Sequence, residues 1–149
     1  MLYWDRRRIA HDFGVQVELD DLLRGADVVT LHLPLTPETR GLIGREELAR
    51  MKRTALLINT ARGALVDERA LAAALQRQEL AGAGLDVFAE EPPGRSHVLR
   101  RCPNVLLTPH TGGQVREAME RMVAVMLENL DRVSRAEEPR YLLSPRAPV

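Results

Sequence analysis

The sequence predicts an α/β protein built on a mainly parallel sheet. Short apolar runs alternate with segments of helical periodicity along the chain, without internal repeats. The apolar runs are continuous rather than alternating, which is typical of parallel strands that are covered on both faces. The connections between the runs are short, as in successive strand and helix units. We therefore expect one sheet with its helices packed against it.

The elements are expected in a regular order. Strands are predicted at residues 2–5, 15–17, 27–34, 56–61, 83–88 and 105–110, where apolar and β-branched residues cluster. Helices are predicted at residues 8–13, 20–24, 46–52, 67–78 and 115–133, where apolar residues recur every three or four positions. Asp67 is suited to be the N-cap of the fourth helix. Residues 136–149 contain three prolines and are expected to be extended.

Composition excludes several classes of function. The 149 residues suffice for one domain, and 21 basic residues balance 21 acidic ones, so neither a nucleic acid nor an anionic membrane is an expected partner. No apolar run reaches the length of a membrane span, and the N-terminus lacks the pattern of a signal peptide. Cys102 is the single cysteine, which excludes an internal disulfide and a cysteine-built metal site, and no other metal site is expected. These features favour a cytoplasmic location.

Arg62 is a candidate substrate clamp. The apolar run that begins at Leu56 ends abruptly at Arg62, and Gly63 follows and allows the backbone to turn. Open α/β sheets bind ligands at the carboxyl ends of their strands, and a guanidinium can hold a carboxylate through two hydrogen bonds. The alternative is that Arg62 merely caps neighbouring backbone carbonyls.

Three strands in succession end in groups that could perform chemistry together. They lead to Arg62, to the segment with Asp86 and Glu91, and to His110. His110 could transfer a proton near neutral pH, and Glu91 could fix its tautomer. Arg62 would hold the substrate carboxylate, while Asp86 would orient a nicotinamide that carries the hydride. This combination describes the oxidation of a 2-hydroxy acid or the reduction of a 2-oxo acid.

Two further residues are candidates for nucleotide contacts. Asp5 closes the first strand, where an acid can accept hydrogen bonds from adenosine ribose hydroxyls and repel a 2'-phosphate. Asp5 could equally be a turn residue, and the arginines at 6–8 leave NADP as the less favoured cofactor beside NAD. His32 lies near the end of its strand, where it could touch the cofactor or simply be a hydrogen-bonded structural histidine.

Four segments carry a resemblance to a known family. They are VVTLHLP at 28–34, LINTARGALVD at 57–67, AGAGLDVFAEEP at 81–92 and NVLLTPHTGG at 104–113. In this order they resemble the NAD-dependent D-isomer-specific 2-hydroxyacid dehydrogenases of the phosphoglycerate dehydrogenase and glyoxylate or hydroxypyruvate reductase type. The resemblance implies a Rossmann-type parallel sheet, with Arg62 as the carboxylate ligand, His110 as the acid/base and Glu91, not Glu90, as its partner. It also implies cofactor contacts, which we assign to Asp5, His32, Pro34, Thr39, Thr60, Ala61, Arg62, Asp86, His110, Gly112 and Gly113.

The resemblance covers less than half of a family member. The part outside it includes a substrate-binding domain and the first strand with its G-x-G-x-x-G turn, which does not occur in these 149 residues. We therefore expect residues 1–135 to form a partial NAD-binding domain and residues 136–149 to return toward a substrate domain. We also expect the sheet to be interrupted beside Val29, and the 149 residues alone to be inactive or nearly so. A homodimer is implied by the family alone.

Other functions remain open at this point. Phosphite dehydrogenases and corepressors of the C-terminal-binding-protein type resemble the same segments and keep the arginine, glutamate and histidine. Formate dehydrogenases are disfavoured, because they carry glutamine where Glu91 stands and asparagine near His32. A degenerate chain without a role of its own is the third possibility. The sequence does not indicate which 2-hydroxy acid would be used.

Overall fold

The structure, a computed structural model, describes residues 1–7, 9, 12 and 14–142. Four residues of the helix expected over 8–13, namely 8, 10, 11 and 13, and the end of the tail, residues 143–149, lie outside the described residues. The chain divides into two compact units, Met1–Pro109 and His110–Val149. Each unit is described by itself.

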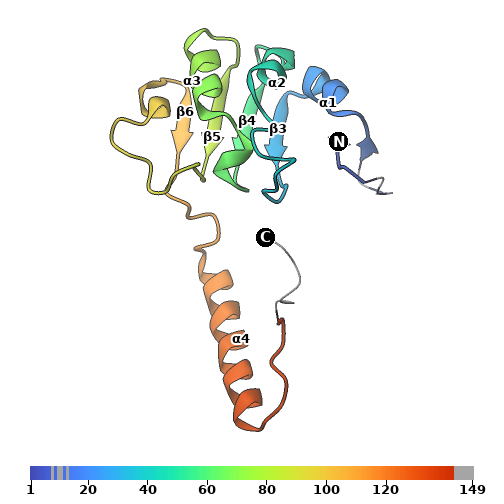
Figure 1. Cartoon of the computed structure of the whole chain (residues 1–149), viewed down its shortest axis with the longest axis vertical. Helices are drawn as coiled ribbons and strands as arrows, with labels where there is room; N and C mark the ends of the chain where they lie inside the picture. The colour runs from blue at the N-terminus through green and yellow to red at the C-terminus, as the bar shows by residue number, and fades with distance from the viewer. Residues whose placement is uncertain (8, 10–11, 13, 143–149) are drawn as a thin grey trace. The chain divides into compact units, whose positions relative to one another are not determined.

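The first unit is organised around a four-stranded parallel sheet. Its strands are β3 (Val28–Leu31), β4 (Leu56–Asn59), β5 (Gly82–Leu85) and β6 (Val105–Leu107), and they lie in the order β3-β4-β5-β6 (Figure 1). Every pair is parallel. The carboxyl ends of the four strands therefore meet at one edge, and the predicted α/β class with a parallel sheet is confirmed. The strands are shorter than predicted because the polar residues after them leave the ladder and form turns.

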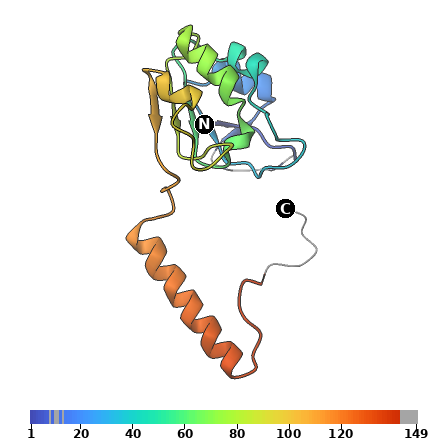
Figure 2. The ribbon, with the colours of Figure 1, turned by 60° about the vertical axis from the view of Figure 1, so that its left-hand side comes forward.

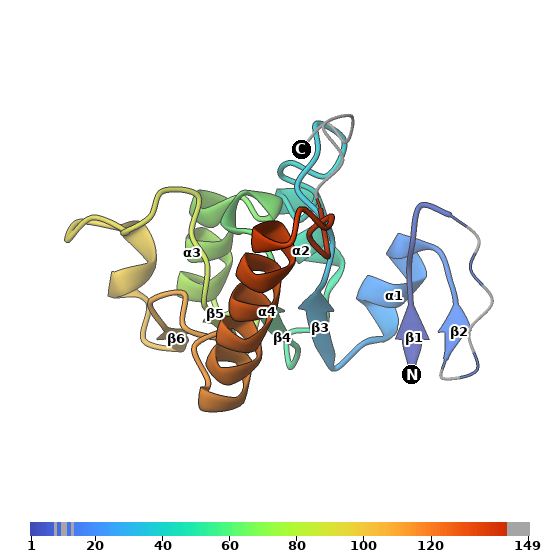
Figure 3. The same ribbon diagram turned by 90° about the horizontal axis from the view of Figure 1, so that it is seen from below.

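A second, two-stranded parallel sheet contains β1 (Leu2–Tyr3) and β2 (Val15–Gln16). It is followed by α1 (Leu19–Gly25), and Figure 3 shows the two strands on the far side of α1 from β3. In the described part of the chain β3 pairs with β4 alone, so Val29 has no strand on its other side. The expected interruption of the sheet is confirmed.

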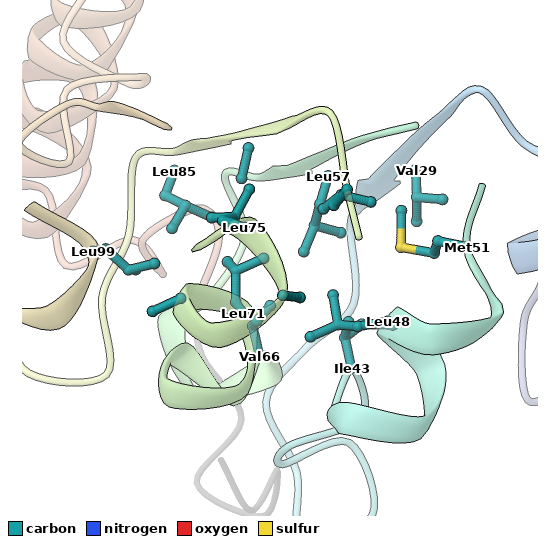
Figure 4. Close-up of a cluster of buried hydrophobic side chains, with 14 of the residues drawn as sticks. Val29, Ile43, Leu48, Met51, Leu57, Val66, Leu71, Leu75, Leu85 and Leu99 are labelled. Carbon is teal, nitrogen blue, oxygen red and sulfur yellow. The ribbon is translucent and has the colours of Figure 1, made fainter. Parts of the chain in front are cut away.

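The core lies between one face of the main sheet and two helices, α2 (Arg45–Arg50) and α3 (Glu68–Gln76). Asp67 caps α3 as predicted, because its carboxylate accepts hydrogen bonds from the backbone N–H groups of Arg69 and Ala70. Two 3-10 turns, η1 (Gly63–Leu65) and η2 (Val98–Arg101), complete this layer. The labelled core residues in Figure 4 are Val29, Ile43, Leu48, Met51, Leu57, Val66, Leu71, Leu75, Leu85 and Leu99.

Within the first unit, helices cover only one face of the strands, whereas the sequence predicts cover on both faces. Leu57 is fully buried, whereas Leu56, Val28 and Leu106 are 41%, 54% and 69% exposed. Successive side chains of a strand point to opposite faces, and α2 and α3 pack on one face only. The apolar run therefore correctly indicates a strand, but it does not indicate which faces are covered within these residues.

The second unit is built on one long helix, α4 (Arg116–Ser134), which Figure 2 shows as an unbroken orange ribbon. None of the residues of α4 is buried. The described part of the tail turns back on α4. The Arg140 backbone N–H donates to Asn129 Oδ1 at 2.7 Å, and the Arg140 guanidinium pairs with Glu128 at 2.8 Å. Among the described residues, no helix is both long enough and apolar enough to cross a bilayer.

Candidate active site

Arg62 lies just beyond the carboxyl end of β4, on a turn that is shaped by Asn59. The Asn59 side chain is 1% exposed. Its Nδ2 donates to the Arg62 carbonyl at 2.9 Å, and its Oδ1 accepts the Ala61 N–H at 3.1 Å. Arg62 itself is exposed, and its Nη1 donates to the Ala61 carbonyl at 2.6 Å. The guanidinium thus caps one carbonyl at the carboxyl edge of the sheet.

Asn59 was not among the site residues predicted from the sequence. Its signal is an amide side chain at the last position of an otherwise apolar strand, where a buried polar group needs hydrogen-bond partners. Both partners are backbone groups of the next three residues. Asn59 therefore fixes the path of the backbone that presents Arg62.

The substitution Asn59→Leu is expected to lower the free energy of unfolding of the first unit by about 2–4 kcal/mol. It removes two hydrogen bonds, so the Arg62 carbonyl loses its donor and the Ala61 N–H loses its acceptor. Urea unfolding followed by circular dichroism measures this change. Thr60→Ala is the control, because Thr60 is exposed and its loss is expected to cost less than about 0.5 kcal/mol. Equal midpoints for the two variants would contradict the role assigned to Asn59.

Glu91 lies on the turn that follows β5. Its Oε1 accepts the Phe88 N–H at 2.9 Å, and the residue is exposed. This turn packs against the Arg62 turn, backbone to backbone. A Cβ placed on Gly63 would lie 1.9 Å from the Phe88 carbonyl carbon and 2.4 Å from the Ala89 nitrogen. The segments that carry Arg62 and Glu91 are therefore neighbours at the carboxyl edge.

Asp86 connects three strand ends. Its backbone N–H donates to the Asn59 carbonyl at 3.0 Å, and its Oδ1 accepts the Thr108 hydroxyl at 2.5 Å. The side chain is buried directly after β5. A buried carboxylate at this edge can accept a hydrogen bond from a ligand amide, which is the role expected for Asp86.

The remaining cofactor candidates of the first unit differ in their surroundings. His32 is exposed, and its Nε2 lies 3.0 Å from the Thr30 hydroxyl. Thr39 is buried, and its hydroxyl donates to the Pro34 carbonyl at 2.7 Å and accepts the Thr36 N–H at 2.8 Å. These bonds give Thr39 a part in shaping the loop after β3. Contacts of His32, Pro34, Thr39, Thr60 and Ala61 with a cofactor remain predictions.

Asp5 follows β1 at the carboxyl end of that strand. Its Oδ1 accepts the Arg7 backbone N–H at 2.8 Å. The Arg6 guanidinium is 3.5 Å from the Glu38 carboxylate, which lies in the loop after β3. Asp5 thus closes a turn, as the alternative interpretation held, and its contact with a ribose remains a prediction. Among the described residues, no group of three or more histidines, cysteines or acids is arranged to hold a metal ion.

His110, Gly112 and Gly113 belong to the second unit. His110 is exposed and has a φ of 54°, a left-handed conformation that few residues other than glycine adopt. Gly113 lies in open space, since a Cβ added there would meet no atom within 4 Å. In the sequence these residues directly follow the β6 segment, and the convergence of His110 with Arg62 and Glu91 remains a prediction.

Comparison with known proteins identifies the family. Residues 1–112 match the model of the D-isomer specific 2-hydroxyacid dehydrogenase, NAD binding domain. A glyoxylate reductase of Aeropyrum pernix is 45% identical over 140 residues, which cover 93% of this chain and 42% of that protein. Among solved structures, TT0316 protein from Thermus thermophilus is 49% identical, with a TM-score of 0.86 over 93% of this chain and 44% of that one.

A second solved structure is a D-lactate dehydrogenase with NAD+ from Lactobacillus jensenii. It is 30% identical, with a TM-score of 0.86 over 96% of this chain and 48% of that one. The chain spans less than half the length of these relatives. On the family match over residues 1–112, the chain belongs to the D-isomer-specific 2-hydroxyacid dehydrogenase family, in its NAD-binding domain.

Proposed function

We propose that the chain is the nucleotide-binding part of a D-2-hydroxyacid dehydrogenase that interconverts a small 2-oxo acid and its D-2-hydroxy acid. The observation that carries the proposal is the packing of the Arg62 turn against the Glu91 turn at the carboxyl edge of the sheet. It supplies a cation for a carboxylate and a carboxylate for an imidazole at the place where parallel sheets bind ligands.

Each side chain has one part in the reaction. Arg62 holds the substrate carboxylate. His110 donates a proton to the 2-oxo oxygen during reduction and removes it during oxidation. Glu91 accepts a hydrogen bond from the far ring nitrogen of His110, which favours the imidazolium form. This assignment makes turnover sensitive to Glu91 and His110 and makes substrate affinity sensitive to Arg62.

Two acidic residues suit NAD, one at the carboxyl edge of the main sheet and one after β1. Buried Asp86 offers an acceptor for a carboxamide, and Asp5 offers an acceptor for ribose hydroxyls. The chemistry that bound NAD(H) supplies is hydride transfer at the nicotinamide ring. NAD is favoured over NADP because Asp5 precedes the arginines that follow β1 and because Arg6 faces Glu38. The family match is to an NAD-binding domain.

A chimera tests the proposal. Residues 1–149 replace the matching part of the Aeropyrum pernix glyoxylate reductase, and NADH consumption is followed with glyoxylate and with a panel of other small 2-oxo acids. We expect turnover in the chimera, a loss of kcat of about 100-fold or more in Glu91→Gln, and little change in Glu90→Gln. A folded chimera that binds NADH and reduces no 2-oxo acid would contradict the proposal.

The remaining assignments concern surroundings and partners. We place the protein in the cytoplasm, because its single cysteine is buried and fits a reducing compartment. We infer a homodimer from the family alone. The relatives described above include a reductase and a dehydrogenase, which favours an enzyme over a corepressor.

Replacing Arg62 tests the clamp directly. In the chimera, Arg62→Ala is expected to raise the KM for glyoxylate by about 100-fold, because a charge-assisted, two-pronged bond to the carboxylate is lost. Arg62→Lys is expected to restore only part of the affinity, since a single ammonium cannot form the paired bonds. Initial-rate kinetics measure both variants, and an unchanged KM would exclude Arg62 as the clamp.

A further inference from the structure

A carboxylate and an imidazole that are mostly buried lie next to the turn that carries Glu91. Glu68 is the first residue of α3, and His97 directly precedes η2. Glu68 Oε2 lies 3.1 Å from His97 Nε2, and each side chain is only 14% exposed. Neither residue belongs to the site assigned above.

Glu68 and His97 each contact the turn that leads to Glu91. The second oxygen of Glu68, Oε1, accepts the Ala89 N–H at 2.9 Å. The ring of His97 meets the buried ring of Phe88 edge to face, with 5.8 Å between centroids. Phe88 in turn donates its N–H to Glu91 Oε1. Glu68 and His97 therefore contact Ala89 and Phe88, which lead into Glu91.

These contacts are not needed to form α3. Asp67 already caps the helix by accepting two backbone N–H groups, so Glu68 is available to bind the loop. The imidazole of His97 makes its hydrogen bond through Nε2, and its Nδ1 is buried without a partner among the described residues. A buried polar atom without a hydrogen-bond partner lowers the stability of the folded state. Other contacts of the His97 ring must therefore offset this cost.

We propose that Glu68 and His97 are positioning residues for Glu91, and that their pair fixes the Phe88–Glu91 turn in the conformation that presents the Glu91 carboxylate. The inference rests on the proposed function, in which Glu91 orients His110. Arg62 lies on a different turn, which is fixed by Asn59. Loss of the pair should therefore affect turnover and leave substrate affinity unchanged.

The first experiment needs no activity. In the 149-residue chain, NMR-detected amide exchange at Phe88 and Ala89 is expected to be about tenfold faster in Glu68→Ala and in His97→Leu, with exchange in β4 and β5 unchanged. His97→Gln is expected to restore protection, because its amide nitrogen can donate to Glu68. Two different variants keep the test informative if one does not fold. Wild-type exchange at Phe88 in both would overturn the inference.

The second experiment separates positioning from general stability. In the chimera, Glu68→Ala and His97→Leu are expected to lower kcat about tenfold with the KM for glyoxylate changed less than about twofold. His97→Gln and the control Arg69→Ala, a neighbour of Glu68 in α3, are expected to stay near wild type. If kcat were unchanged in Glu68→Ala but strongly reduced in Glu91→Gln, this inference would be overturned and the proposed function would stand. An unaffected Glu91→Gln would overturn the proposed function, while amide exchange would still decide whether the pair holds the turn.

Discussion

Replacing His110 by glutamine in the chimera is expected to lower kcat about 1,000-fold, within the range that a positioned general acid/base contributes. Glutamine keeps a polar side chain of similar reach, but its amide cannot donate a proton to the 2-oxo oxygen and recover it at neutral pH. The KM should change little, because the substrate carboxylate is assigned to Arg62. NADH affinity should change little, because the other proposed cofactor contacts, Asp5, His32 and Asp86 among them, are kept.

The measurement combines steady-state kinetics with NADH binding followed by fluorescence. Binding serves as the control, since it shows that the variant is folded and that its nucleotide site is intact. The double variant of His110→Gln and Glu91→Gln should be hardly slower than His110→Gln, because Glu91 is proposed to act through the imidazole. Retained turnover in His110→Gln would remove His110 from the reaction.

The parallel strands and the alignment of their carboxyl ends could be predicted from the sequence. Continuous apolar runs that end in Arg62 and Asp86 predicted parallel strands with polar tips, and the structure aligns those tips at one edge. Which face of each strand is buried could not be predicted from the sequence. Leu56 and Leu57 are equally apolar, and only the packing of α2 and α3 makes the second buried and the first exposed.

The supporting residues could not be predicted for a different reason. Glu68 and His97 are separated by 28 intervening residues, and each resembles an ordinary surface residue of a helix start or a loop. Their relation depends on the backbone path of residues 88–97, which no local pattern determines. Asn59 did leave a local signal, because a buried amide at the end of an apolar strand requires partners nearby.

Gly63→Ala is expected to destabilise the first unit by about 3 kcal/mol or more, because overpacking against backbone cannot be relieved by a change of rotamer. The added Cβ would lie 1.9 Å from the Phe88 carbonyl carbon, so η1 or the Glu91 turn must move. Glycine is required here for close approach and not for an unusual φ, since Gly63 is absent from the residues with positive φ.

Other glycines give a graded series for the same measurement. A Cβ on Gly82 would lie 2.8 Å from the Asn104 carbonyl oxygen, one on Gly84 would lie 3.1 Å from the flexible end of Ile58, and one on Gly94 would meet nothing within 4 Å. Alanine at these positions should therefore destabilise in the order Gly63, Gly82, Gly84, Gly94, with Gly94→Ala within about 0.5 kcal/mol of wild type. Urea unfolding midpoints give the order. If Gly63→Ala had the same unfolding midpoint as Gly94→Ala, the Arg62 turn and the Glu91 turn would not be in contact. Their packing would then no longer support the dehydrogenase assignment.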